Sequence, residues 1–183
     1  MFKGNGKSIP IIFFVLFLTG IIIYTVSYIK NERYFYFWDF VAYQDTANNF
    51  LNLAKIHNPL LLFESAWNSL KTDYNFFWVF PIIPFLFLLN PFTERLSFVL
   101  SIVMVYHIPL TVIIASLVTK ISHNSEKGSI PILLGVMFLT PAFWIPTLRG
   151  YPDVGGSLIL FVAVTLYLSN HKREWLIYGL MGV

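Results

Sequence analysis

The apolar run SIPIIFFVLFLTGIIIYTVSYI, residues 8–29, decides the fold class of this chain. It lies between Lys7 and Lys30 and contains no charged residue. At about 1.5 Å of rise per residue, a helix over this run is long enough to cross a hydrocarbon core of roughly 30 Å. The basic flank is shared with signal peptides, but the apolar part is longer than a typical signal-peptide core, and no small-x-small cleavage site follows. We therefore predict an uncleaved membrane anchor.

The composition of the whole chain also indicates an integral membrane protein. Of its 183 residues, 57% are hydrophobic, 19% are aromatic and only 11% are charged, which is too little charge for the surface of a soluble domain of this size. The net charge of +3 comes from scattered Lys and Arg residues, so the sequence offers no basic patch for nucleic acid. The absence of cysteine excludes disulfides, thiolate nucleophiles and Cys-based metal sites.

Further apolar runs extend the pattern to an all-α, multi-spanning protein. Charge-free runs at about residues 96–119, 129–148 and 154–171 are each predicted to span, and another span is predicted to start at residue 175. Because the chain stops inside that last run, residues 1–183 are predicted to form the N-terminal part of a larger membrane domain.

Residues 76–89 are apolar but too short for a comfortable crossing, and Pro81 and Pro84 interrupt them. If this segment does not cross, six basic residues lie in short cytoplasmic segments; if it crosses, only four do. The positive-inside tendency therefore favours an interfacial or re-entrant segment and an extracytoplasmic loop over residues 30–95. In this topology Asp39, Asp45 and Asp153 all emerge on the outer face, although only basic residues were counted to choose it.

The outer loop is predicted to contain two amphipathic helices lying at the membrane surface. Ala47, Phe50, Leu51 and Ala54 repeat at helical spacing with asparagines on the other side. Asn58-Pro59 then has the form of an N-cap followed by a proline at the first helical position, opening a short helix to about Leu70.

The stretch YFYFWDFVAYQD, residues 34–45, places acids among aromatic rings just after the first span. Asp39 is our candidate catalytic base, because a partly desolvated carboxylate at a membrane surface can take a proton from an acceptor hydroxyl. The alternative is an incidental acid in an interfacial aromatic belt. Tyr43 follows one helical turn later and could share the face of Asp39, or serve only as an interface anchor. Asp45 is a candidate substrate-binding residue whose structural alternative is an N-cap for the helix from Ala47.

The second outer loop contains LRGYPDVGG, residues 148–156, with Arg149, Tyr151 and Asp153 as candidate substrate-binding residues. An Arg in such a loop can hold a phosphate through paired N–H donors, or it can merely pair with Asp153. The prolines at 141, 146 and 152 are expected to discourage regular helix here.

His107, inside a predicted span, is interpreted as an interhelical hydrogen-bond donor. Zinc-protease, nucleotide-loop, serine-hydrolase and dinucleotide-binding motifs are absent from the sequence.

Together these features resemble the GT-C glycosyltransferases, multi-spanning enzymes that use polyprenyl-phosphate-linked sugars and include protein O-mannosyltransferases and aminoarabinose transferases. The resemblance rests on FWDFVAY with Asp39, on RGYPD with Asp153, and on ERLSFVLSIVMVY with Arg95 at the start of a membrane helix. It covers nearly all of this chain and corresponds to the front part of a family member. Phe40 follows Asp39 where protein O-mannosyltransferases have an acidic pair, which argues against a protein acceptor of that kind.

The resemblance implies transfer of a hexose or pentose, with inversion, to a hydroxyl of a lipid, glycan or protein acceptor. The active site would face the extracytoplasmic side of a bacterial inner (plasma) membrane and serve the cell envelope. Asp39 would deprotonate the acceptor, and Arg149 would face the lipid phosphate, with Lys71 and Arg95 as weaker candidates. Asp153 would hold hydroxyls or share a divalent cation (Mg or Mn) with Asp39. The competing hypothesis is a non-enzymatic transporter of lipid-linked substrates or a scaffold subunit, although the predicted spans carry few polar groups for transport.

Overall fold

The computed structural model describes residues 8–33, 39–56, 58–71, 76–89, 93–121 and 141–168. These ranges are helical and contain no strand, which confirms the all-α part of the prediction. The elements are α1 (Ser8–Lys30), α2 (Asp39–Lys55), α3 (Pro59–Ser69), the 3-10 helix η1 (Phe76–Ile82), α4 (Ile83–Leu88), α5 (Glu94–Ile102), the π-helical turn η2 (Val103–His107), α6 (Ile108–Ile121), α8 (Pro141–Arg149) and α9 (Val154–Leu168).

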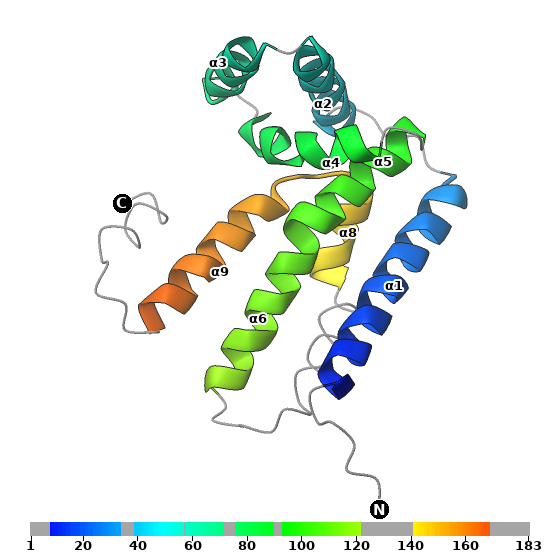
Figure 1. Ribbon diagram of the computed structural model, residues 1–183, viewed down its shortest axis with the longest axis vertical. Helices are drawn as coiled ribbons and strands as arrows, with labels where there is room; N and C mark the ends of the chain where they lie inside the picture. The colour runs from blue at the N-terminus through cyan, green and yellow to red at the C-terminus, as the bar shows by residue number, and fades with distance from the viewer. Residues whose placement is uncertain are drawn as a thin grey trace, which may run out of the picture.

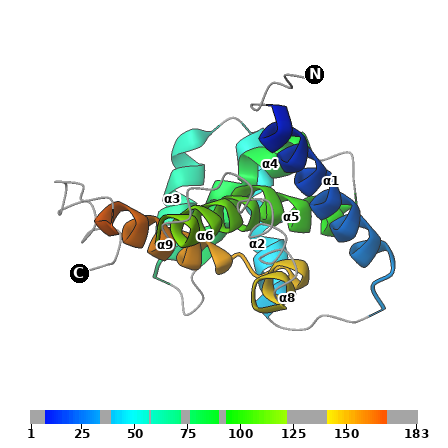
Figure 2. The ribbon, with the colours of Figure 1, turned by 90° about the horizontal axis from the view of Figure 1, so that it is seen from below.

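Two helical segments are long and apolar enough to cross a membrane, namely Ile12–Lys30 and Glu94–Val118. They correspond to the predicted spans at 8–29 and 96–119. Figure 2 shows α1 at the periphery of the bundle, and only 11% of its apolar window is buried. Large apolar side chains such as Phe13, Leu16 and Ile23 therefore face outward, as suits contact with lipid.

The other predicted spans are described only in part. Helix α9 covers 15 residues of the predicted span 154–171, which is shorter than a typical crossing. Of the predicted span 129–148, only the part in α8 belongs to the described residues. The start of a further span at residue 175 lies outside them.

The segment with the two prolines does not run along the bundle. It forms η1 and then α4, a piece too short to count as a candidate span. Figure 1 shows it lying across the end of the bundle, beneath α2 and α3, whereas α1, α6, α8 and α9 run lengthwise. The segment is therefore not one of the candidate spans, and its interfacial or re-entrant placement stays a prediction.

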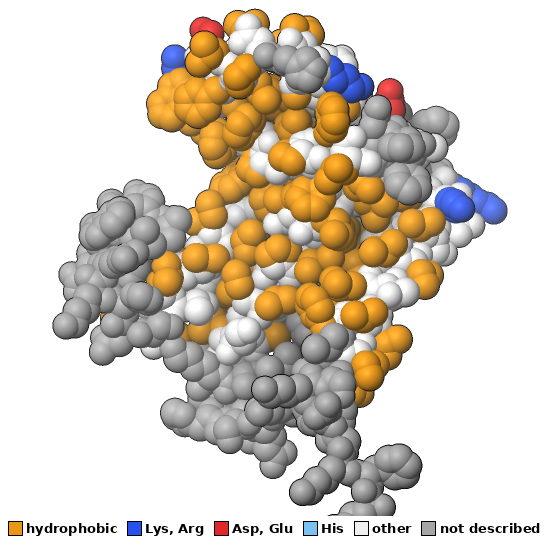
Figure 3. Space-filling model, in the orientation of Figure 1, with side chains coloured by type: hydrophobic (Ala, Val, Ile, Leu, Met, Phe, Trp, Pro, Cys, Tyr) orange, Lys and Arg blue, Asp and Glu red, His pale blue; other side chains and the backbone are white. Residues whose placement is uncertain are grey.

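Charged side chains gather at that same end. On the face shown in Figure 3, they lie over α2, α3 and the neighbouring ends of α1 and α5, while the lower part of the described surface is orange and white. The described part of this face therefore carries its charged side chains at one end and is largely apolar elsewhere. We call the end formed by α2, α3, η1, α4 and the α8–α9 turn the polar end.

Helix α2 begins earlier than predicted. It starts at Asp39 rather than near Ala47, because buried Phe40 and Tyr43 continue the apolar face of Ala47 and Phe50 upstream by two turns. The prediction for α3 is confirmed, since Asn58 Oδ1 accepts a hydrogen bond from Leu61 N at 3.2 Å.

The expectation that prolines would prevent helix near residue 146 is wrong. Pro146 lies inside α8, and a Schellman-type turn ends that helix: Tyr151 N donates to Pro146 O and Gly150 N to Thr147 O, both at 3.0 Å. Gly150 has φ +87°, a conformation that favours glycine. A Cβ there would also lie 2.7 Å from Nη1 of Arg95, so a larger residue would displace the guanidinium as well as strain the backbone.

The core at the polar end joins α2, α3, η1 and α4 to α5, α6 and α9. It contains buried Tyr43, Phe50, Ile82, Phe98 and Tyr106. Because α2 packs on the bundle through these side chains, its first turn is held against the α8–α9 turn. This packing brings the two predicted acidic loops together.

Candidate functional site

Tyr43 connects the two loops directly. Its phenol donates to both carboxylate oxygens of Asp153, at 3.0 Å and 3.1 Å. Tyr43 comes from α2, whereas Asp153 is the last residue before α9, so this contact spans 110 positions of sequence. The Tyr43 ring also packs edge-on against Phe76 at 5.4 Å and Tyr151 at 6.3 Å between centroids. We call Asp39, Tyr43, Tyr151 and Asp153 the acidic site.

Asp39 lies in the first turn of α2, one helical turn before Tyr43, and its charge acts on both partners of the hydrogen bond. Burial is the main cause that raises the pKa of Asp153; the Tyr43 hydrogen bond lowers it, and the negative charge of Asp39 raises it. Asp153 is an exposed residue, but its hydrogen bond with Tyr43 is partly buried. The pKa of Tyr43 is raised by burial and then by Asp153, so Tyr43 stays a protonated donor at neutral pH.

These causes predict opposite shifts for two substitutions. Tyr43→Phe removes the hydrogen bond to the carboxylate and is expected to raise the pKa of Asp153, whereas Asp39→Asn removes a neighbouring negative charge and is expected to lower it. A pH titration of carbon-13-labelled aspartate by NMR in detergent micelles measures both. A fall of the Asp153 pKa in Tyr43→Phe would contradict this account of the site.

The same shift has a consequence for stability. The native pKa of Asp153 is raised above 3.8, so the native state binds the proton more tightly than the unfolded chain does. The contribution of this group to the free energy of unfolding therefore falls as pH rises from about 3.8 through the native pKa. Asp153→Asn is expected to remove that pH dependence in chemical denaturation.

A partly buried ion pair lies beside the loop that carries Asp153. Arg95, at the start of α5, donates from Nε and Nη2 to the two oxygens of Glu32, at 3.1 Å and 3.0 Å. The same guanidinium donates to the carbonyl oxygens of Leu148 at 2.8 Å and Arg149 at 3.4 Å, and it lies 4.3 Å from the centroid of the Phe40 ring. We call this arrangement the Arg95 clasp.

The Arg95 clasp supplies hydrogen-bond donors to the C-terminal end of α8. The last four carbonyls of a helix lack partners inside the helix. Here those of Pro146 and Thr147 accept from the following backbone, and those of Leu148 and Arg149 accept from Arg95. A positive guanidinium at a helix C-terminus is also favourable for the helix dipole. The turn from Gly150 to Asp153 is therefore held in place by hydrogen bonds on both of its sides.

The clasp changes the roles predicted for the basic residues. Arg95 is already paired with Glu32, so we no longer expect it to hold a phosphate. Lys71 lies just after α3 and its Nζ is 3.5 Å from Asn68 Oδ1. Arg149 is the last residue of α8, with an exposed side chain. No ion pair joins it to Asp153 among the residues described, so the alternative of an Arg149–Asp153 pair is wrong.

Asp45 is not brought to the acidic site. It lies inside α2 and cannot be an N-cap, and its side chain is exposed. Two positions after Tyr43, it is turned by roughly 200° around the helix axis. The early start of α2 explains why Asp45 is not an N-cap. Of the aromatic residues predicted to desolvate Asp39, Phe40 is buried next to Arg95, while residues 34–38 lie outside the described part of the chain.

His107 is buried in η2, between α5 and α6. Its Nδ1 lies 3.3 Å from Oγ1 of Thr147 on α8, and its ring packs at 4.2 Å from that of Trp144. These contacts between helices agree with the predicted role as an interhelical hydrogen-bonding residue.

A divalent cation does not fit the described site well. Within the residues described, no group of three or more His, Asp or Glu side chains could hold a metal ion. Asp39 and Asp153 supply two carboxylates, fewer ligands than a hard cation takes, and Asp153 already accepts from Tyr43 on both oxygens. We therefore derive no step through a metal.

Glu32 lies beside the candidate site, and the sequence pattern did not indicate it. It supports the loop of Asp153 through Arg95, from which it is separated by 63 positions. Its only signal in the sequence is an acid directly after the first apolar run.

Comparison with protein-family models, curated proteins and solved structures finds no match to this chain, so the GT-C resemblance rests on the residues quoted above.

Proposed function

We propose that this chain supplies the acceptor side of a membrane glycosyltransferase that takes its sugar from a polyprenyl-phosphate donor. The single observation that carries the proposal is the hydrogen bond from Tyr43 to Asp153, which joins the two acidic loops with Asp39 one helical turn away. One acid can act as the base for the acceptor hydroxyl, and the other can hold hydroxyl groups in position. The apolar helical surface beside them suits a lipid-linked donor.

In the proposed reaction Asp39 takes the proton of the acceptor hydroxyl. The hydroxyl oxygen attacks the anomeric carbon from the face opposite the donor phosphate, so that a new carbon–oxygen bond forms while the bond to the phosphate oxygen breaks. The lipid phosphate leaves with the bonding electron pair, and the configuration is inverted. Asp153, oriented by Tyr43, accepts hydrogen bonds from sugar or acceptor hydroxyls, and Tyr151 forms one wall.

The proposed setting is a plasma membrane with the polar end on the extracytoplasmic side. Support comes from the two helices long enough to cross, from the outward apolar surface of α1 and from the charged side chains at one end (Figure 3). The proposal includes further spans from the predicted runs at 129–148 and 154–171.

The proposed sugar transfer is tested with a labelled polyprenyl-phosphate donor, by comparing the full-length protein with its Asp39→Asn variant.

Arg149 is the proposed partner of the donor phosphate, because it lies two residues before Tyr151 and its guanidinium is not used by the Arg95 clasp. Arg149→Ala is expected to raise the apparent KM for the donor about tenfold, the size of a lost charge-assisted hydrogen bond, with a smaller change in kcat. Steady-state kinetics against donor concentration measure this split. Lys30→Ala, which removes an exposed positive charge at the end of α1, is the control. An unchanged donor KM in Arg149→Ala would refute the assignment.

A further inference from the structure

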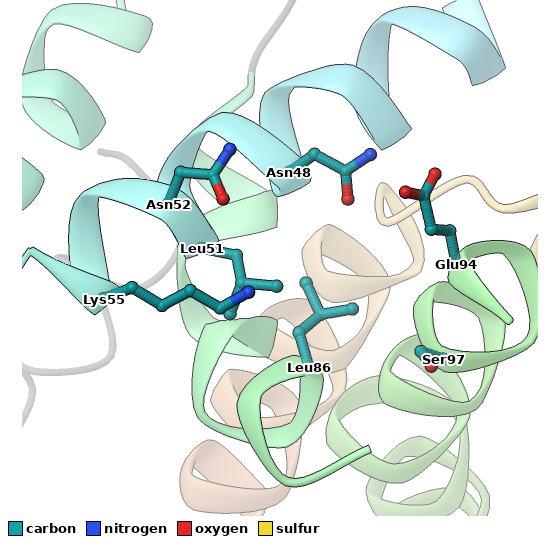
Figure 4. A pocket seen from close by; sticks show the side chains of 7 residues that line it. All are labelled: Asn48, Leu51, Asn52, Lys55, Leu86, Glu94 and Ser97. Atoms are coloured by element: carbon teal, nitrogen blue, oxygen red, sulfur yellow. The ribbon is translucent and has the colours of Figure 1, made fainter. Parts of the chain in front are cut away.

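A cavity of about 320 Å³ lies between α2, α4 and α5, apart from the acidic site. Its lining divides into a buried floor and a polar rim. The floor contains Leu51, Leu86 and Ser97, and the rim contains Asn48, Asn52, Lys55 and Glu94 (Figure 4). On α2 the rim residues lie roughly 120–180° around the helix axis from Tyr43, so this cavity and the acidic site occupy different sides of one helix. Its size is within the range of small-ligand pockets, roughly 300–1,000 Å³.

The rim carries opposite charges at opposite ends. Figure 4 shows Lys55 entering the cavity from one end and Glu94 from the other, with the amides of Asn48 and Asn52 between them. An ammonium attracts a phosphate, and a carboxylate attracts a primary ammonium. The amides can donate to phosphate oxygens and accept from an ammonium. This arrangement is complementary to a small dipolar group that carries both a phosphate and a primary amine.

The position of the cavity beside the start of an apolar segment indicates a ligand with apolar tails. Glu94 is the first residue of the long apolar segment Glu94–Val118, so the cavity lies at the level where that segment begins. Leu86 in its floor is followed by Phe87 and Leu88, whose side chains are 53% and 72% exposed. A ligand whose headgroup occupies the cavity can therefore extend acyl chains over an exposed apolar surface, which a soluble ligand would leave uncovered.

We propose that this cavity binds the headgroup of an aminophospholipid of the phosphatidylethanolamine type. The phosphate lies toward Lys55 and the primary ammonium toward Glu94, with the acyl chains passing over α4. A quaternary choline headgroup has no N–H donor for Glu94, and an anionic headgroup without an amine places no cation beside it. The site therefore selects the primary amine. The inference does not depend on sugar transfer.

The test counts bound lipids on the full-length protein by native mass spectrometry in detergent. Phosphatidylethanolamine and phosphatidylcholine with matched acyl chains are added in equal amounts. About fivefold greater retention of phosphatidylethanolamine is expected, the size of one partly exposed charge pair, with Glu94→Gln bringing the ratio close to one. Lys55→Gln is expected to weaken the retention of both lipids, because both carry the phosphate.

Matched controls come from α3 and the residues just after it. Glu64→Gln and Lys71→Gln make the same charge changes at exposed positions outside the cavity, and both are expected to keep the lipid ratio of the unmodified protein. Circular dichroism establishes that each variant is folded. Equal retention of the two lipids, or an unchanged ratio in Glu94→Gln, would overturn the proposal. Binding of soluble phosphoethanolamine as tightly as the lipid would overturn the assignment to a lipid.

Discussion

Asp39→Asn is expected to lower sugar transfer by the full-length protein by roughly 10²- to 10⁴-fold, the contribution typical of a general base. The amide keeps the size of the side chain but cannot accept the acceptor's proton. Radiolabelled sugar transfer from a polyprenyl-phosphate donor, in membranes with equal amounts of each variant, measures the loss. Because the substitution also removes repulsion toward Asp153, the fold is expected to be retained.

Asp45→Asn is the matched control for this experiment. It makes the same chemical change six positions later on the same helix, at an exposed position turned away from Tyr43. It is expected to leave transfer near the unmodified level. Equal activity of Asp39→Asn and Asp45→Asn would remove Asp39 as the base, whereas a loss in both would show that α2 as a whole, rather than one carboxylate, matters.

Arg95→Met is expected to destabilise the protein by about 3 kcal/mol, the lower end of the usual cost of breaking a buried ion pair from one side, because this pair is partly buried. The side chains of Arg95 and Glu32 are only 16% and 9% exposed, so the substitution leaves the Glu32 carboxylate without its partner in a poorly solvated place. It also removes the donor for the carbonyls of Leu148 and Arg149. Chemical denaturation in detergent micelles, followed by circular dichroism, measures the change.

The double variant Glu32→Gln/Arg95→Met distinguishes the stability lost with the ion pair from the stability lost at the C-terminal end of α8. Removing the unpaired charge is expected to recover a large part of the loss, and the remainder reports the unsatisfied carbonyls of α8. If Arg95→Met alone cost under about 1 kcal/mol, the Arg95 clasp would be no more than a surface pair. Glu64→Gln on α3 serves as the exposed reference substitution.

Local patterns in the sequence were sufficient for several features. The absence of charge over residues 8–29 predicted α1, and the Asn58-Pro59 pair predicted the cap of α3, because both depend on neighbouring residues alone. The four-residue spacing of Asp39 and Tyr43 predicted a shared face once the segment is helical, and α2 is helical from Asp39. The start of α2 was misjudged because the rings before Ala47 read as an interfacial belt rather than as the first turns of a buried face.

The pairings across the chain could not be predicted in this way. Glu32 and Arg95 are both ordinary charged residues near helix ends, and nothing in their spacing selects one partner over another. Likewise, Asp153 had Arg149 as the obvious partner in sequence, yet Tyr43 is the residue that bonds it. Pro146 was expected to break a helix, but α8 continues through it to Arg149 and ends at a turn that Gly150 and Arg95 complete.

The sequence by itself determined that this protein is helical and apolar, and that its acids lie beside the ends of its apolar runs, because hydropathy and helical period are properties of consecutive residues. Only the tertiary structure decided which acid faces which donor. That choice depends on the packing of α2 against η1, α4 and α5, which brings Tyr43 to Asp153, 110 positions away in the sequence. The contact is partly buried, and charges and hydrogen bonds act more strongly there than in water.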